Sequence, residues 1–135
     1  MSTHVANIRT HENAALRAFV AELHKRFAAD VHQVLLFGSA ARGETTSESD
    51  IDLLIVVDED SWDLQTKIDE LSVETDLAHD VVISDMIISA ERFQEMRQQR
   101  EPLYKSIERE GITLWQRESA TSPTTQGALP AEEQE

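Results

Sequence analysis

Two aspartates at alternate positions, Asp50 and Asp52, begin one of the most apolar segments of this 135-residue chain, which continues to Val57. Side chains at positions i and i+2 of a strand project from the same face, so both carboxylates would be aimed at one point. Unpaired, they repel each other and the pKa of one rises, whereas a hard cation such as Mg²⁺, carried in with a nucleotide, would stabilise both. The alternative interpretation is a pair of solvated acids at a strand edge, in a chain that holds 26 acidic residues.

A glycine and a serine, Gly38 and Ser39, follow the apolar run 34–37. Small residues at the end of a buried strand let backbone N–H groups and a hydroxyl approach a polyphosphate closely, especially if a short helix begins at Ala40. The pair is therefore a candidate phosphate-binding turn. Taken alone, Gly-Ser after a strand is more typical of an ordinary turn, so the prediction depends on the neighbouring aspartates.

Arg42 lies in the same segment of small residues. Its guanidinium has the fork-shaped geometry that binds phosphate, which would make Arg42 part of a nucleotide site. The other interpretation is that Arg42 pairs with Glu44 or Glu48 and braces the turn. The sequence leaves both interpretations open.

A third carboxylate is expected from a neighbouring strand, because two-metal phosphoryl transfer needs ligands for two ions. Asp80 precedes the apolar run 81–83 and is the predicted residue, as a shared metal ligand and as general base for an acceptor hydroxyl. Asp76 would lie on the preceding helix and Asp85 past the far end of the strand. Both therefore rank below Asp80.

Hydrophobic periodicity predicts the elements that must hold these residues. Apolar positions three and four apart indicate amphipathic helices, and short apolar runs bounded by polar residues or glycine indicate buried strands. We expect helices over 10–29, 61–78, 89–99 and 102–110, and strands over 31–37, 50–57, 80–84 and 112–115. Trp62 and Trp115 are interpreted as packing residues rather than base-stacking platforms. The predicted fold class is α/β (α+β), with three or four strands flanked by helices.

The length of the chain fits one domain of ordinary size. We place that domain at residues 1–116. From residue 117 to 135 the chain is rich in Ser, Thr, Pro, Gln and Glu and poor in apolar residues, which predicts a disordered acidic tail.

The charge balance excludes several classes of function. Lys and Arg number 12 against 26 Asp and Glu, and the resulting net charge of −14 repels a phosphate backbone, so no direct nucleic-acid partner is expected. The absence of cysteine excludes disulfides, a thiol nucleophile and thiolate metal ligands. No apolar stretch approaches the roughly 18 residues of a membrane span, and the amino terminus does not resemble a signal peptide. We therefore expect a soluble, cytoplasmic protein with no membrane partner.

The combined pattern resembles a known signature. Gly38-Ser39, then ten residues, then Asp50-x-Asp52 is similar to the signature of the DNA polymerase β-type nucleotidyltransferase superfamily, and Gly-Ser-x-Ala-Arg-Gly with Ser-Asp-Ile-Asp-Leu resembles its minimal nucleotidyltransferase (MNT) branch. The likeness extends over about residues 10–116. It implies a mixed-sheet palm that binds ATP and Mg²⁺ and transfers a nucleoside monophosphate. Gly38 and Ser39 would hold phosphates, Asp50 and Asp52 would bind metal, and Asp80 would complete the triad.

The resemblance also implies a partner. Members of the MNT branch are commonly encoded beside HEPN ribonuclease toxins and act as antitoxins that adenylylate a tyrosine of the toxin. A hetero-oligomer of this chain with such a toxin is therefore expected. Two other interpretations stay open, namely an antitoxin that only covers its toxin without catalysis, and a small-molecule nucleotidyltransferase similar to the aminoglycoside-modifying enzymes.

Overall fold

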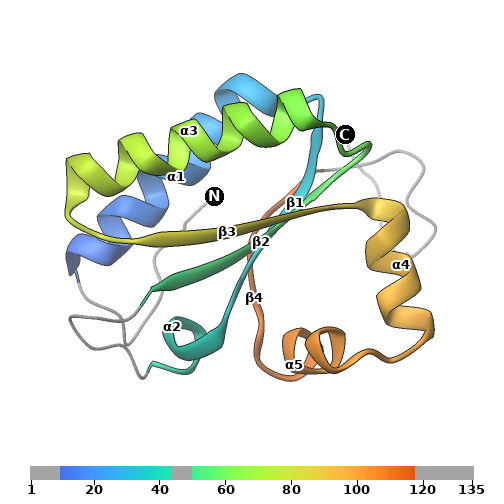
Figure 1. Ribbon diagram of the computed structural model, residues 1–135. Helices are drawn as coiled ribbons and strands as arrows, with labels where there is room; N and C mark the ends of the chain where they lie inside the picture. The colour runs from blue at the N-terminus through green and yellow to red at the C-terminus, as the bar shows by residue number, and fades with distance from the viewer. Residues whose placement is uncertain (1–9, 44–49, 118–135) are drawn as a thin grey trace, which may run out of the picture.

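A computed structural model describes residues 10–43 and 50–117 of the chain (Figure 1). The described elements alternate between helices and strands except for α4 and α5, which follow each other directly. In chain order they are α1 (Thr10–Phe27), β1 (Val31–Phe37), α2 (Gly38–Arg42), β2 (Ile51–Val57), α3 (Trp62–His79), β3 (Ile83–Ser89), α4 (Ala90–Gln98), α5 (Pro102–Glu110) and β4 (Ile112–Gln116).

The four strands form one mixed sheet in the order β3-β2-β1-β4. Strand β1 pairs antiparallel with both β2 and β4, and β2 pairs parallel with β3 through the crossover helix α3. The predicted fold, a small mixed sheet flanked by helices, is confirmed. The two most apolar strands, β1 and β2, occupy its centre.

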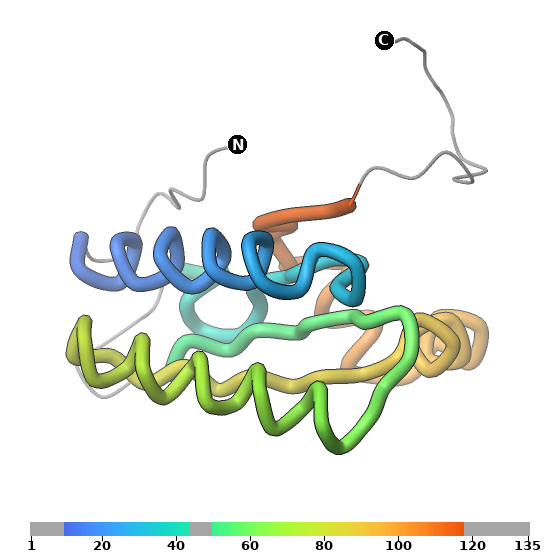
Figure 2. The backbone as a smooth tube through the Cα atoms, turned by 90° about the horizontal axis from the view of Figure 1, so that it is seen from above, coloured from blue at the N-terminus to red at the C-terminus, as the bar shows by residue number. Residues whose placement is uncertain are grey.

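Helices α1 and α3 cover one face of the sheet and lie side by side when viewed from above (Figure 2). Their apolar side chains pack against every second residue of β2, namely Ile51, Leu53, Ile55 and Val57. This is the larger of the two cores, and its main helical side chains are Leu16, Phe19, Leu23, Leu64, Ile68 and Leu71.

Helices α4 and α5 cover part of the opposite face. Here Leu54 and Val56 of β2 pack with Leu35 of β1 and Ile107 of α5. Because side chains alternate along a strand, Asp52 projects from this same face of β2, at the end of the strand beyond Leu54. The smaller core therefore lies on the face of the sheet from which Asp52 projects.

Several predicted element boundaries are confirmed. The Ser61 hydroxyl accepts a hydrogen bond from the Leu64 N–H at 3.1 Å and caps α3, and Pro102 begins α5. Helix α1 ends at Phe27, two residues before the predicted end. Ser89 caps α4 through the Arg92 N–H at 3.0 Å.

The predicted position of the third strand is wrong. It was expected over residues 80–84, whereas β3 runs over Ile83–Ser89. Helix α3 continues to His79, and Asp80 then adopts a left-handed conformation with φ 57°. A residue in that conformation does not extend a strand, so pairing with β2 starts at the Ile51 N–H, which donates to the Val82 carbonyl at 2.8 Å.

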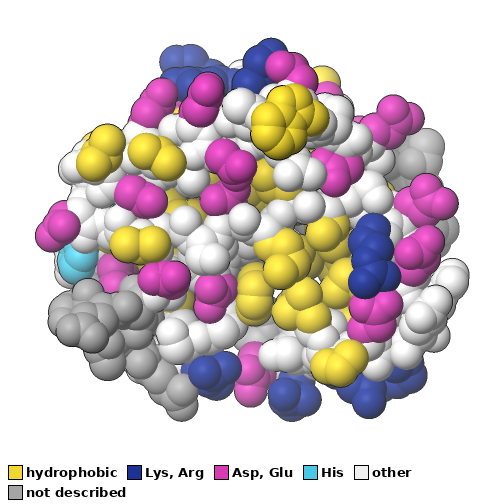
Figure 3. Space-filling model, in the orientation of Figure 1, with side chains coloured by type: hydrophobic (Ala, Val, Ile, Leu, Met, Phe, Trp, Pro, Cys, Tyr) yellow, Lys and Arg dark blue, Asp and Glu magenta, His cyan; other side chains and the backbone are white. Residues whose placement is uncertain are grey.

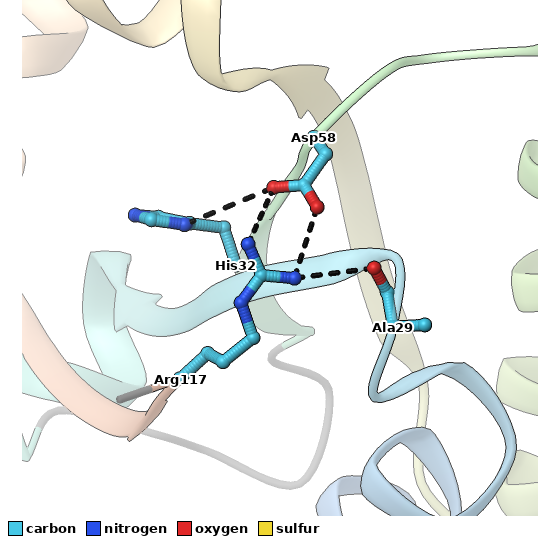
Figure 4. Close-up of polar contacts among 4 residues, drawn as sticks. All are labelled: Ala29, His32, Asp58 and Arg117. Atoms are coloured by element: carbon cyan, nitrogen blue, oxygen red, sulfur yellow. Dashed lines mark hydrogen bonds and ion pairs between the residues drawn. The ribbon is translucent and has the colours of Figure 1, made fainter. Parts of the chain in front are cut away.

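Arg117, the first residue of the predicted tail, belongs to the folded domain (Figure 4). Its N–H donates to the His32 carbonyl at 2.9 Å, and its guanidinium forms two hydrogen bonds with the Asp58 carboxylate, at 2.8 and 2.9 Å. A further bond of 3.1 Å reaches the Ala29 carbonyl. We call this cluster of four residues the Arg117 clasp. The rest of the predicted tail lies outside the described residues.

Across residues 10–43 and 50–117, every helix is too short or too polar to cross a lipid bilayer.

Candidate active site

The site is built around Asp52, the second residue of β2, which is half-buried. In the register of the sheet it stands opposite Phe37, the last residue of β1. Asp50 immediately precedes β2 and is exposed. The negative charge of Asp50 acts on Asp52, so the structure brings the two predicted carboxylates close enough to repel each other.

Gly38 lies directly against the Asp52 carboxylate. Its φ is +74°, and a Cβ atom at this position would overlap Oδ2 of Asp52. Only glycine meets both conditions without strain, because a left-handed backbone and the absence of a side chain are needed together. The glycine that the sequence singled out thus allows the β1–α2 backbone to touch the acidic end of β2.

The turn after Gly38 is a single short helix, α2, which starts at Gly38 rather than at the expected Ala40. Ala40 is fully buried and anchors α2 to the larger core, and Ser39 follows Gly38 in the first turn. The N–H groups of a first helical turn have no partner within the helix, so those of α2 are donors at this end of the sheet. Gly43, with φ 74°, ends the helix.

The pKa of Asp52 is raised above its ordinary value. Burial is the largest cause and repulsion by Asp50 the second, while the positive charge of Arg42 acts in the opposite direction. The guanidinium of Arg42 also contacts the Glu110 carboxylate of α5 at 3.3 Å. The predicted alternative partners of Arg42, Glu44 and Glu48, lie outside the described residues.

Asp80 does not join Asp50 and Asp52 in the described part of the chain. It is the exposed C-terminal cap of α3, where its N–H donates to the Asp76 carbonyl. Among residues 10–43 and 50–117, no three His, Asp or Glu side chains are close enough together to hold a metal ion. In the described residues Asp50 acts on Asp52, and Asp80 lies at the C-terminal cap of α3, so its role as the third ligand stays a prediction.

The register explains why no other residue of β3 replaces Asp80. Ser84 stands opposite Asp52, so the position of β3 that shares its face carries a hydroxyl. Asp85 is opposite Leu53 and projects toward α3, where the Ser72 hydroxyl donates to its Oδ1 at 3.1 Å. Asp85 therefore lies within β3, and its predicted place past the far end of the strand is wrong.

Asp76 is the acid that sequence reasoning undervalued. Its Oδ1 accepts the Ile83 N–H at 2.9 Å, which fixes the first residue of β3 beside β2. The pKa of Asp76 is raised, first by burial and further by the charges of Asp85 and Asp50, and lowered in part by this hydrogen bond. Its position three residues before the end of a helix gave no signal of either role.

The family model of the polymerase beta nucleotidyltransferases matches residues 20–120. This chain belongs to that nucleotidyltransferase family. The match spans the site and all strands of the sheet, so the Gly-Ser turn and the Asp-x-Asp strand of this nucleotidyltransferase lie within the family's domain.

Two relatives come from Methanocaldococcus jannaschii, and each carries the name of a candidate protein adenylyltransferase. The first is 39% identical over 83 residues, which cover 62% of this chain and 79% of the relative. The second is 48% identical over 42 residues, which cover 29% of this chain and 42% of that protein.

Solved structures share the fold. A candidate nucleotidyltransferase from Sulfolobus solfataricus matches with a TM-score of 0.51 and 17% identity, over 84% of this chain and 94% of its own. A toxin–antitoxin crystal structure with AMP-PNP matches with a TM-score of 0.50 and 19% identity, over 73% of this chain and 72% of that chain. Both matches confirm the architecture of the nucleotidyltransferase palm.

Proposed function

We propose that this nucleotidyltransferase moves AMP from ATP to a tyrosine hydroxyl of a HEPN ribonuclease toxin, with Mg²⁺, and so acts as its antitoxin. The observation that carries the proposal is the contact between Gly38 and the Asp52 carboxylate. It places a backbone turn suited to phosphate beside a pair of acids suited to a metal ion, on adjacent strands and at the same end of the sheet.

ATP would bind with its β- and γ-phosphates on the α2 turn. Gly38 leaves room for close approach, the first-turn N–H groups are donors, and the Ser39 hydroxyl adds another. Arg42 is in the last turn of the same helix, and its charge already reaches Asp52. We propose that Arg42 contacts the triphosphate in the nucleotide complex, in exchange for its contact with Glu110.

Mg²⁺ fits the two acids on chemical grounds. Asp50 and Asp52 offer only oxygen ligands, which Mg²⁺ prefers. The partial burial of Asp52, and after it the repulsion by Asp50, raise the pKa of Asp52, and Arg42 offsets this only in part. When bound there, Mg²⁺ would supply positive charge to the carboxylates and to the triphosphate at once.

The transfer is an in-line displacement. The acceptor oxygen bonds to the α-phosphorus, the bond from that phosphorus to the bridging oxygen breaks, and pyrophosphate leaves. The hydroxyl proton passes to a carboxylate, and Asp80 is the residue that we propose for this role and for the third metal ligand. Its place three residues before β3 puts it at the same end of the sheet as Asp50.

A protein acceptor is supported by the relatives. The relative that is 39% identical is a candidate protein adenylyltransferase, and one structural neighbour is a toxin–antitoxin crystallised with AMP-PNP. A tyrosine is the proposed target because the MNT resemblance implies it.

The test is to incubate the purified chain, ATP and Mg²⁺ with the product of the adjacent gene and to measure intact masses. The expected result is a shift of that product by one or more AMP units and none with Asp52→Asn. An aminoglycoside serves as the competing acceptor in a parallel reaction. Modification of the aminoglycoside together with an unmodified gene neighbour would contradict the proposed function.

A further inference from the structure

Helix α3 carries an apolar stripe on the side that faces away from the sheet. Trp62, Val73 and Leu77 have exposed fractions of 84%, 53% and 82%. At 100° per residue they fall within one narrow sector of the helix, opposite the buried Leu64, Ile68 and Leu71. The prediction that Trp62 is a packing residue is therefore wrong for the isolated chain, whereas Trp115 is buried.

Acidic side chains flank this stripe. Asp69, Glu70 and Glu74 are exposed and, together with Trp62 and Val73, line a groove of about 570 Å³. Along α3, yellow apolar groups alternate with magenta acidic ones on the face shown in Figure 3. Helix α3 holds five Asp and Glu against one Lys, and that Lys67 is paired with Asp63 at 3.1 Å.

We propose that this surface, the α3 stripe, docks an amphipathic helix whose apolar side chains are flanked by Lys and Arg. The stripe runs for about 22 Å from Trp62 to Leu77, which is the length of four helical turns. A helix laid along it would bury three large apolar side chains and place its basic residues against Glu70 and Glu74.

The negative charge of the α3 stripe argues against two other occupants, a second copy of this chain and residues 118–135. A second copy of this chain would bring an equally acidic α3 stripe against the first, in a chain of net charge −14. Residues 118–135 contain four glutamates and neither Lys nor Arg, so they lack the complementary charge. A basic partner also gains from electrostatic steering toward this surface.

The position of the stripe connects it with the proposed function, on which this part of the inference rests. Leu77 lies at the end of α3 that leads into Asp80 and the start of β3, beside β2 and Asp50. A protein held along α3 would therefore extend toward the site. The α3 stripe is thus the docking surface for the substrate protein, distinct from the groups that perform the transfer.

The test compares the wild type with a double variant, Trp62→Lys and Leu77→Lys. Both positions are exposed, so the fold should be retained, which circular dichroism and thermal unfolding would verify. The matched control is Glu91→Gln with Glu108→Gln on α4 and α5, which changes the net charge by the same two units at exposed positions. The probe is a synthetic 18-residue amphipathic helix with Lys flanks, and a peptide with Glu flanks is its counterpart.

The Lys-flanked peptide should bind the wild type and the control alike, and its affinity for the stripe variant should fall at least tenfold. The Glu-flanked peptide should not bind. Equal binding of the Lys-flanked peptide to the stripe variant, or none to the wild type, would overturn the docking surface. Loss of self-association in the stripe variant, by sedimentation, would identify a second copy as occupant and overturn it too.

A transfer assay with the protein encoded by the adjacent gene tests this inference separately from the proposed function. At saturating concentrations of that protein, the rate of AMP transfer should be unchanged in the stripe variant, while the KM for the protein rises at least tenfold. Transfer that proceeds with an unchanged KM contradicts docking on α3 and leaves the proposed function intact. Binding that depends on the stripe without any transfer contradicts the proposed function alone.

Discussion

The two ends of the sheet use charged side chains in opposite ways. At one end, Arg117, which follows β4, binds the carboxylate of Asp58 after β2 and the carbonyl of Ala29 in the turn before β1. In this Arg117 clasp the positive charge of Arg117 is paired with the negative charge of Asp58. At the other end, Asp50 and Asp52 repel each other, and the backbone at Gly38 lies directly against the Asp52 carboxylate. The paired charges of the Arg117 clasp hold the domain together. The acids at the other end are compensated only in part by Arg42, so they are suited to bind a cation from outside the chain.

The largest expected effect comes from Asp52→Asn. Transfer should fall by about 10²–10³-fold or more, because a ligand for the metal and a charge at the phosphates are lost. The melting temperature should stay equal or rise, because an uncharged amide avoids the cost of burying a charge and the repulsion by Asp50, the two causes that raise the pKa of Asp52. A radiolabelled transfer assay and thermal unfolding measure the two quantities. A clearly lower melting temperature would show that Asp52 is structural.

Gly38→Ala should damage both stability and activity. A left-handed φ strains the alanine and its Cβ overlaps the Asp52 carboxylate, so we expect a loss of about 1–3 kcal/mol in the free energy of unfolding and a large loss of transfer. Urea denaturation measures the first. Gly43→Ala is the control because Gly43 has the same φ of 74°. If both variants lose the same stability, the contact with Asp52 is not the cause.

Arg117→Ala should lower stability and leave transfer unchanged. The bidentate pair with Asp58 is partly exposed, so we expect a loss of about 1 kcal/mol in the free energy of unfolding. Arg117→Lys, which keeps the charge and loses the fork, should recover only part of it. An Arg117→Ala variant that unfolds normally and transfers poorly would show that the two ends of the sheet are coupled.

A smaller effect on stability is expected from the carboxyl pair Asp69 and Asp85, which lies between the two ends of the sheet. A hydrogen bond with Asp85, together with burial and the Asp85 charge, raises the pKa of Asp69 to about 7. Oδ2 of Asp85 is buried without a donor among the described residues, so a proton on Asp69 would supply one. Because the folded pKa lies above the ordinary value of 3.8, this contribution to stability is complete below about pH 4. It is lost as the pH rises through about 7.

The melting temperature should therefore fall between pH 6 and 8 in the wild type, and this slope should flatten in Asp69→Asn. Glu70→Gln, the same kind of exchange at the next residue, should keep the slope. An unchanged slope in Asp69→Asn would assign the effect to another group.

The sequence predicted the site end of the sheet better than the remainder. The signals for Gly38, Asp50 and Asp52 each lie within one short segment of the chain. Such local patterns can be recognised directly in a sequence. The third strand was misplaced because Ser84 and Asp85 interrupt its apolar run, although Oδ1 of Asp85 accepts a hydrogen bond from Ser72 of α3. Such a contact between α3 and β3 has no signal in either segment alone.

The Arg117 clasp escaped prediction for the same reason. Arg117 and Asp58 are 59 positions apart, and Arg117 precedes a segment of tail-like composition. The exposure of Trp62 was missed because a tryptophan beside a helix cap is ordinarily a packing residue. Its 84% exposure depends on which side of α3 meets the sheet.

The most direct measurement is calorimetry of ATP binding to the wild type and to Asp52→Asn, each with Mg²⁺ and with EDTA. If Asp50 and Asp52 need a metal-bound nucleotide to complete their compensation, the wild type should bind ATP only with Mg²⁺. Asp52→Asn should lose most of this dependence and bind ATP in EDTA better than the wild type does, since one repelling charge is gone. Equal affinity of the wild type for ATP with Mg²⁺ and with EDTA would contradict the account.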